Sequence, residues 1–273
     1  MFFHCGKFRL SLARPLVMGI INVTPDSFFD GGKYFSAERA VAHAWQLIEE
    51  GADILDIGGE STRPGAPPVG TEEELRRVLP VLEGLRGVTV PMSVDTQKAE
   101  VMRAALAAGA SMVNDVNALR APGALEAVAT SDCGVCLMHM QGEPRTMQQA
   151  PSYDDVVGEV LGFLRERLAD VEAAGVVRER IVLDPGFGFG KMLEHNLALL
   201  CGLDRIAELG VPVLAGLSRK SMLGKLIGND STDRTAASVA AALLAAQKGA
   251  RILRVHDVRS TVDALAVLQA LKN

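Results

Sequence analysis

The feature of this sequence that most restricts its fold is a repeat of short apolar runs separated by helix-like segments. Each run has the length of a strand and is continuous rather than alternating, which is typical of a strand buried on both faces of a parallel sheet. Eight such runs occur: Leu16–Ile21, Ile54–Ile57, Met92–Val94, Met112–Val116, Val135–Met138, Ile181–Leu183, Val213–Leu217 and Ile252–Val255.

A helical pattern follows every run. Eight strands that each lead into a helix, without a linker between them, predict an α/β fold with a single (β/α)8 TIM barrel over residues 16–273. Five glycines stand where helix C-caps would precede the next strand, at Gly51, Gly109, Gly175, Gly210 and Gly249. The helical segments are Ala37–Glu50, Glu72–Arg86, Lys98–Ala108, Gly123–Thr130, Asp154–Ala174, Leu193–Leu209, Thr235–Lys248 and Thr261–Leu271.

Residues 1–15 lie outside this repeat. Two short segments, Phe2–Cys5 and Phe8–Leu12, flank Gly6-Lys7 and predict a β-hairpin. Because the chemistry of a barrel is placed at the C-terminal ends of its strands, we expect this hairpin to close the opposite end.

Composition excludes several classes of protein. The formal net charge is −5, so a broad basic surface for nucleic acid is not expected. No run approaches the roughly 18 apolar residues of a membrane span, and no signal peptide is apparent, so we expect a cytoplasmic protein without a membrane partner. The four cysteines do not form a disulfide framework. Cys133 and Cys136 form a lone C-x-x-C pair, which we interpret as buried apolar residues.

Polar or ionisable side chains stand at the end of every apolar run, and therefore at one mouth of the predicted barrel. The acidic and amide members come mainly from the middle strands, and a carboxylate placed there needs a partner. The cationic members come from strands two, seven and eight and suit a phosphate or pyrophosphate. We expect a pit for a heterocycle, formed by Asp95, Asn114 and Asp184, beside a cationic rim of Arg63, Arg219, Lys220, Arg254 and His256.

Three loops at this mouth carry further signals. Thr24–Phe35 and Gly58–Gly70 exceed the usual length of a strand-to-helix loop in a barrel, which suggests lids over the site. Phe28 and Phe29 lie in the first lid. Asp184–Lys191 is rich in glycine but fits neither the Rossmann nor the P-loop spacing, so we expect it to approach a flat ligand, with Phe189 lining it.

Eight motifs in these positions closely resemble dihydropteroate synthase, a family of folate biosynthesis and the target of sulfonamides. The resemblance runs in order from about residue 16 to the C-terminus. The motifs are Asn22–Phe28, Gly58–Gly65, Ser93–Thr96, Asn114-Asp115, Leu137–Met140, Asp184–Lys191, Ser218–Ser221 and Arg254–Asp257.

The resemblance implies that 6-hydroxymethyl-7,8-dihydropterin pyrophosphate is joined to p-aminobenzoate, giving 7,8-dihydropteroate and pyrophosphate, with Mg²⁺ as cofactor and a homodimer as the assembly. It assigns catalysis to Asp95, Lys220 and Arg63. Carried over position by position, it assigns the pterin to Asp95, Asn114, Met138, Asp184 and Lys220, the pyrophosphate to Asn22, Thr62, Arg63, Arg254 and His256 with Asn22 near the metal, and the p-aminobenzoate side to Phe28, Thr62, Pro64, Phe189, Arg219 and Ser221.

The implied mechanism is an SN1-like substitution. Pyrophosphate leaves once its charge is neutralised, an anionic Asp95 stabilises the cation on the pterin methylene, and the aniline nitrogen attacks. The rival interpretations are a methyltetrahydrofolate:corrinoid methyltransferase barrel, a non-catalytic paralogue and, less favoured, a metal-dependent hydrolase. Phe29 stands where the family commonly has a small residue, so the sequence leaves the response to sulfonamides open.

Overall fold

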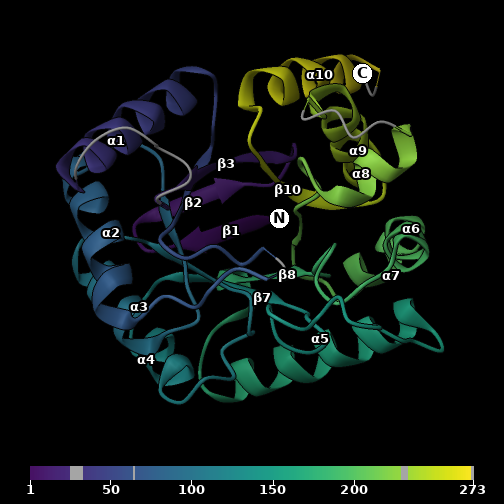
Figure 1. Ribbon diagram of the computed structural model, residues 1–273, viewed down its shortest axis with the longest axis horizontal. Helices are drawn as coiled ribbons and strands as arrows, with labels where there is room; N and C mark the ends of the chain where they lie inside the picture. The colour runs from purple at the N-terminus through teal and green to yellow at the C-terminus, as the bar shows by residue number, and fades with distance from the viewer. Residues whose placement is uncertain (25–32, 64, 229–232, 272–273) are drawn as a thin grey trace.

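The computed structural model describes residues 1–24, 33–63, 65–228 and 233–271. Eight parallel strands close into a barrel in the order β10-β3-β4-β5-β6-β7-β8-β9, and helices surround it (Figure 1). The predicted (β/α)8 fold is therefore confirmed. The barrel strands are β3 (Leu16–Asn22), β4 (Ile54–Gly58), β5 (Met92–Asp95), β6 (Met112–Asp115), β7 (Gly134–Met138), β8 (Ile181–Asp184), β9 (Val213–Ala215) and β10 (Ala250–Val255).

The helices follow the strands as the apolar periodicity predicts, and the five glycines proposed as C-caps all have positive φ. No helix among the described residues is both long and apolar enough to cross a membrane. The helices are α1 (Lys33–Glu49), α2 (Thr71–Gly84), α3 (Ala99–Ala107), α4 (Ala124–Ala129), α5 (Val156–Ala173), α6 (Leu193–Cys201), α7 (Leu203–Ala207), α8 (Ser221–Ile227), α9 (Thr235–Gln247) and α10 (Val258–Ala270), with a 3-10 turn, η2, at Arg178–Arg180.

Two helical predictions need correction. The segment Leu193–Leu209 is not one helix, since it breaks at Gly202, where a Cβ would come within 3.0 Å of Val157 on α5. The structure also contains α8, which the sequence pattern does not predict because Gly224 in its middle disfavours a helix. A Cβ at that position would lie 2.9 Å from the Arg234 guanidinium, so a larger residue would require this flexible side chain to shift.

Several predicted boundaries shift as well. α1 begins at Lys33, within the segment expected to be a lid, and α10 begins three residues before Thr261. The remainder of the first lid, with Phe28 and Phe29, lies outside the described residues, as does Pro64 of the second lid.

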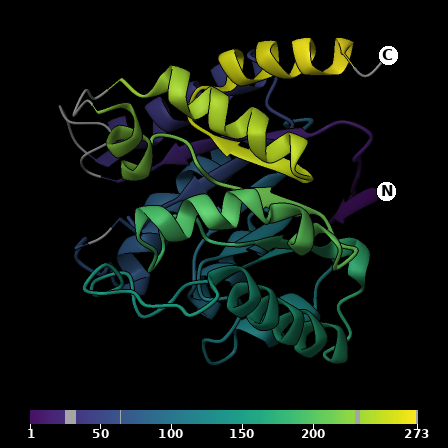
Figure 2. The same cartoon turned by 90° about the vertical axis from the view of Figure 1, so that its right-hand side faces the viewer.

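The N-terminal hairpin closes the barrel at the end opposite the strand-to-helix loops, as expected (Figure 2). Its strands, β1 (Phe2–Cys5) and β2 (Phe8–Ser11), pair antiparallel in a separate sheet. Phe3 is fully buried, and a Cβ on Gly134 at the start of β7 would lie 2.5 Å from its ring. The hairpin packs a small core of Phe3, Cys5 and Leu12 against strand residues Leu16, Met18, Ile54, Met112, Cys136, Val182, Leu214 and Ile252.

Candidate active site

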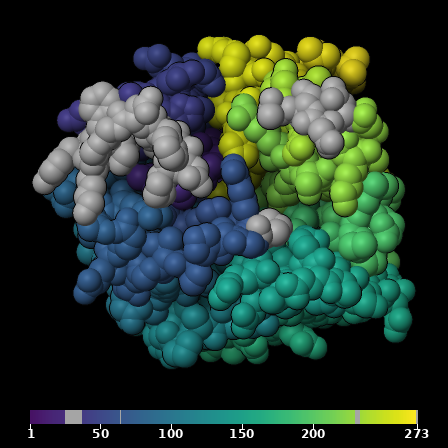
Figure 3. Space-filling model, in the orientation of Figure 1, coloured from purple at the N-terminus to yellow at the C-terminus, as the bar shows by residue number. Residues whose placement is uncertain are grey.

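The polar residues predicted at the strand ends lie around one mouth of the barrel. Asp95 pairs in register with Asn114 on the neighbouring strand, and Met138 pairs with Asp184. Asn22 lies beside Gly58, which lies beside Asp95. Segments that are far apart in the sequence meet on this face (Figure 3). The parallel register therefore brings the predicted pterin residues side by side.

The centre of this mouth is a cluster of two carboxylates around one guanidinium. Arg254 Nε donates to Asp56 Oδ2 at 2.6 Å, and its Nη2 donates to Asp95 Oδ2 at 2.7 Å. Asn114 Nδ2 donates to the same Asp56 oxygen at 3.1 Å. Arg254, predicted for the pyrophosphate rim, thus also ties the acidic pit together.

Asp56 is the residue of this cluster to which the sequence analysis gave no role. It is completely buried in β4, and its second oxygen, Oδ1, has no hydrogen-bond partner among the described residues. The sequence pattern could have identified this residue, because Asp56 is the one ionisable residue inside the apolar run Ile54–Ile57. A carboxylate inside such a run must be paired to be tolerated.

Burial sets the protonation of the acidic pit. Burial raises the pKa of Asp95 to about 7, while the Arg254 guanidinium opposes this shift and the Asp56 carboxylate adds to it. Burial also raises the pKa of Asp184, although Lys220 and the amide N–H of Gly186 oppose it. Both effects follow from the cost of removing a charge from water.

Lys220 follows β9, the strand beside β10, which carries Arg254. Its Nζ donates to the carbonyl of Phe187 and lies 4.6 Å from the centroid of the Phe189 ring, a cation–π distance. Burial lowers the pKa of Lys220 to about 8, with Asp184 opposing the shift. Lys220 therefore interacts with Asp184 electrostatically, while its direct hydrogen bond goes to the loop backbone.

An apolar wall completes the pit. Val116, Met138, Met140 and Met147 form a buried cluster, and Phe189 packs against it. A flat heterocycle needs such a surface for its faces and polar groups for its edge. Met138 and Phe189, both predicted at the site, belong to this apolar surface.

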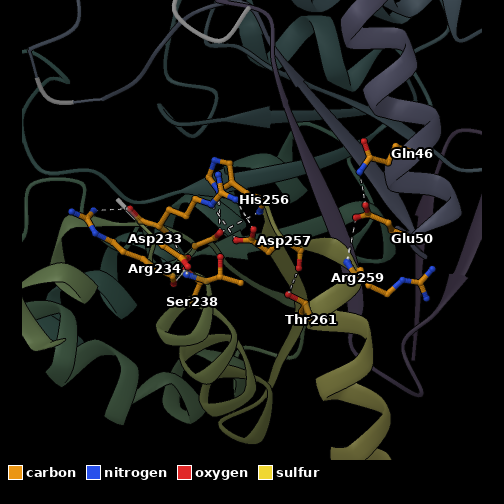
Figure 4. A network of polar contacts seen from close by, with 12 residues as sticks. Gln46, Glu50, Asp233, Arg234, Ser238, His256, Asp257, Arg259 and Thr261 are labelled. Atoms are coloured by element: carbon orange, nitrogen blue, oxygen red, sulfur yellow. Dashed lines mark hydrogen bonds and ion pairs between the residues drawn. The ribbon is translucent and has the colours of Figure 1, made fainter. Parts of the chain in front are cut away.

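The cationic rim is held by a second polar network (Figure 4). Ser218 Oγ lies 2.9 Å from His256 Nδ1, and Arg219 forms two hydrogen bonds to the Asp257 carboxylate. Burial and the neighbouring Arg254 and Arg219 lower the pKa of His256 to about 4, so its imidazole is neutral at pH 7. Neutral His256 can bind an anion as a hydrogen-bond donor rather than as a charge.

A groove between the Gly188 loop and α8 contains Ser221, one of the residues predicted for p-aminobenzoate. Ser221 opens α8 and is exposed, while Arg219, at φ +57°, adopts a left-handed backbone just before it. Phe28 and Pro64, predicted for this side, lie outside the described residues. The groove is lined by Gln148, Gly188, Lys191, Met192, Leu193, Asn196, Lys220, Ser221, Met222 and Lys225.

The second predicted lid, the loop between β4 and α2, is tied to the next loop of the barrel. Lys98 Nζ lies 2.5 Å from Glu60 Oε2 and 2.6 Å from Glu74 Oε2, and Glu74 is completely buried. Glu60 in turn accepts from the amide of Val69 at 2.9 Å. Both ends of this loop are therefore held, with half-buried Thr62 and exposed Arg63 between them.

Within the described part of the chain, no three histidine, cysteine or acidic side chains form a group suited to a metal ion. Asn22, the predicted metal residue, is half-buried at the end of β3. Mg²⁺ commonly binds through one or two protein groups together with substrate phosphates and waters. A single amide oxygen at the predicted pyrophosphate site would suit that mode of binding.

Comparison with known proteins agrees with this geometry. A profile described as "Pterin binding enzyme" matches residues 18–256. The dihydropteroate synthase of Escherichia coli (strain K12) is 52% identical over 262 residues, which cover 96% of this chain and 93% of that protein.

Solved structures of dihydropteroate synthases superpose closely on the structure of this chain. Xanthomonas albilineans dihydropteroate synthase with 4-aminobenzoic acid has a TM-score of 0.94 at 59% identity, covering 99% of this chain and 98% of the other. The enzyme of that organism with 7,8-dihydropteroate has a TM-score of 0.91 at 56% identity, and the match covers 100% of this chain and 99% of the other. The Yersinia pestis enzyme in a sulfonamide drug complex has a TM-score of 0.94 at 47% identity, and the match covers 100% of this chain and 99% of the other.

A closed barrel with an acidic, amide-lined pit beside a cationic rim, matched over most of its length by that profile, defines a pterin-binding enzyme. Sequence identities of 52% and 59% to dihydropteroate synthases, over nearly the whole chain, then narrow this class to one family. The chain belongs to the dihydropteroate synthase family.

Proposed function

We propose that this chain is an active dihydropteroate synthase, a transferase that joins 6-hydroxymethyl-7,8-dihydropterin pyrophosphate to p-aminobenzoate and releases pyrophosphate. The observation that carries the proposal is the bridge formed by Arg254 between Asp56 and Asp95, beside Asn114. In this proposal, the pterin and its departing pyrophosphate meet at this cation and its two carboxylates. A non-catalytic paralogue would have no need to keep so costly an arrangement buried.

Two groups of side chains bind the pterin in this proposal. Asp184 and Asn114 face the donors and acceptors of its pyrimidine edge, and Lys220 donates to its ring acceptors. Met138 and Phe189 lie on the apolar wall against which a flat ring packs. Thr62, Arg63, Arg254 and neutral His256 bind the pyrophosphate.

The reaction proceeds by an SN1-like path. The bond between the pterin methylene carbon and the pyrophosphate oxygen breaks, and the oxygen keeps the electron pair. Asp95 in its ionised form stabilises the resulting cation, which is delocalised into the pterin ring. The aniline nitrogen of p-aminobenzoate then forms the new C–N bond and loses a proton to water, with Ser221, Arg219 and Phe189 on its side of the site.

Mg²⁺ is part of the proposal, held by Asn22 and by the oxygens of the substrate. When bound, it would neutralise charge on the pyrophosphate and so make it a better leaving group. Arg63 and Arg254 carry out the same neutralisation from the protein side.

The assembly and location complete the proposal. A homodimer is supported by exposed apolar residues on two neighbouring helices, Leu244 on α9 and Val267 on α10, which are 51% and 66% exposed. Light scattering with size exclusion tests it. A cytoplasmic location is supported by the four cysteines, all of which are unpaired.

The direct test is turnover. The purified protein is incubated with the pterin pyrophosphate, Mg²⁺ and p-aminobenzoate, and both pyrophosphate and dihydropteroate are quantified. We expect equal amounts of the two products. Pyrophosphate without dihydropteroate would indicate a degenerate enzyme. Absence of both products, with retained binding of methyltetrahydrofolate, would instead favour a corrinoid methyltransferase barrel.

A further inference from the structure

The structure assigns a positioning role to Lys191, which we infer holds the loop Gly186–Gly190 so that Lys220 and Phe189 face the substrates. This inference rests on the proposed function, since it concerns how that site is kept in shape. Lys191 stands at the end of the glycine-rich motif and only 3% of it is exposed.

The contacts of Lys191 use all three of its donors. Its Nζ lies 2.9 Å from His139 Nδ1, 2.9 Å from the carbonyl of Gly186 and 3.0 Å from that of Phe189. Two of these acceptors belong to the loop after β8, and the third follows β7. A single ammonium group therefore ties the loop to the neighbouring strand.

His139 is suited to accept this hydrogen bond. Burial lowers its pKa to about 3, with Lys191 and Arg120 adding to the shift, so the imidazole is neutral at pH 7. Its ring is also fixed by an edge-on contact with Phe163 at 5.0 Å between centroids. His139 thus supplies a rigid acceptor.

A positive charge without a carboxylate partner is costly to bury. Burial lowers the pKa of Lys191 to about 7, and the nearby Lys220 adds to this, although Asp184 opposes it. Every direct acceptor of Lys191 is a carbonyl or an imidazole. Because burying this charge is costly, the lysine is better explained by the acceptors that it holds in place.

The loop that Lys191 holds contributes directly to the site. Phe187 supplies the carbonyl to which Lys220 donates, and Phe189 supplies the ring that Lys220 faces. The loop packs closely against the chain after β7, because a Cβ on Gly186 would collide with the carbonyl of His139. A shift of this loop would therefore move Lys220 and Phe189 together.

The test compares Lys191→Met with Val171→Ala in the full-length enzyme. Methionine keeps the apolar stem of lysine and removes every donor. Val171 is fully buried near the far end of α5 and serves as a destabilised control outside the site. Steady-state kinetics for both substrates and hydrogen–deuterium exchange of the free enzyme are measured well below each variant's Tm.

For Lys191→Met we expect kcat/KM for p-aminobenzoate to fall about 10²-fold, the loss typical of a misplaced binding group. We also expect faster exchange over residues 186–190, while Val171→Ala keeps wild-type kinetics and loop exchange. A Lys191→Met enzyme with a lower Tm but unchanged kinetics and loop exchange would overturn the inference.

A second variant covers the case in which Lys191→Met does not fold. His139→Phe removes one acceptor and keeps a ring against Phe163, so a smaller change in the same direction is expected. Unchanged kinetics and exchange in that variant would overturn the inference. The exchange measurement needs no turnover. The hold of Lys191 on the loop therefore remains testable even if the wild-type enzyme forms no dihydropteroate and the proposed function fails.

Discussion

Arg254 Nε donates to Asp56 Oδ2 at 2.6 Å, although the two residues are 198 positions apart in the chain. β4 carries the aspartate and β10 the arginine, and β3 separates these strands in the barrel. Closure of the barrel is thus what brings the two charges together. The same guanidinium reaches Asp95, so Asp56 fixes the position from which Arg254 acts.

Asp56→Asn should lower both stability and substrate affinity. Losing one charge-assisted hydrogen bond costs about 1.5–3 kcal/mol, and Arg254 keeps Asp95 as a partner. We expect a lower free energy of unfolding in urea and a higher KM for the pterin pyrophosphate. Asp204→Asn removes a solvent-exposed pair, 3.8 Å from Lys248, and should change neither measurement. Equal free energies of unfolding and equal KM values in the two variants would contradict the structural role of Asp56.

Asp95→Asn should keep the fold and lose turnover. The amide preserves the shape of the side chain but cannot supply the negative charge that stabilises the pterin cation. We expect kcat to fall about 10²–10³-fold, as for loss of a preorganised electrostatic contact. Rapid-quench measurement of pyrophosphate release checks the chemical step, and circular dichroism checks the fold. Near-normal turnover would exclude this role.

The pH profile of kcat/KM should be bell-shaped. Asp95, whose pKa lies at about 7, must be ionised, so activity rises with pH through that value. Lys220, whose pKa lies at about 8, must be protonated, so activity falls as pH rises further. The observed limbs belong to the coupled charges of the pit. The residual activity of Asp95→Asn should lose the acidic limb, and persistence of that limb would assign it to another group.

Lys98→Met should loosen the loop that carries Thr62 and Arg63. The substitution removes the partner of Glu60 and of buried Glu74 while keeping the apolar stem. We expect a several-fold higher KM for both substrates, measured by initial rates. Arg76→Ala on α2, where the Arg76 side chain is exposed to solvent, is the control and should leave KM unchanged.

Phe3→Ala should affect stability without affecting the site. Removing a fully buried phenylalanine costs about 3–5 kcal/mol, and the hairpin closes the end of the barrel away from the substrates. We expect a large drop in Tm with KM unchanged at 20 °C below the new Tm. A selective change in KM would show that the hairpin communicates with the mouth of the barrel.

The sequence by itself determined the barrel and most of its mouth. Runs such as Val135–Met138 and Ile181–Leu183 are apolar throughout because both faces of a barrel strand are buried, and this pattern is local enough to be recognised in a single chain. The polar residue that ends each run lies at the same mouth by topology alone. Asp95, Asn114 and Asp184 were found in this way.

Only the tertiary structure decided which side chains meet. That Asp56 would be bridged by Arg254, or that Lys191 would bond to His139, depends on contacts between distant segments. The same reason explains α8, which forms beside Arg234 although Gly224 in its middle disfavours a helix locally. Local propensity and periodicity act over a few residues, whereas the partner of a buried charge is chosen by the packing of the whole barrel.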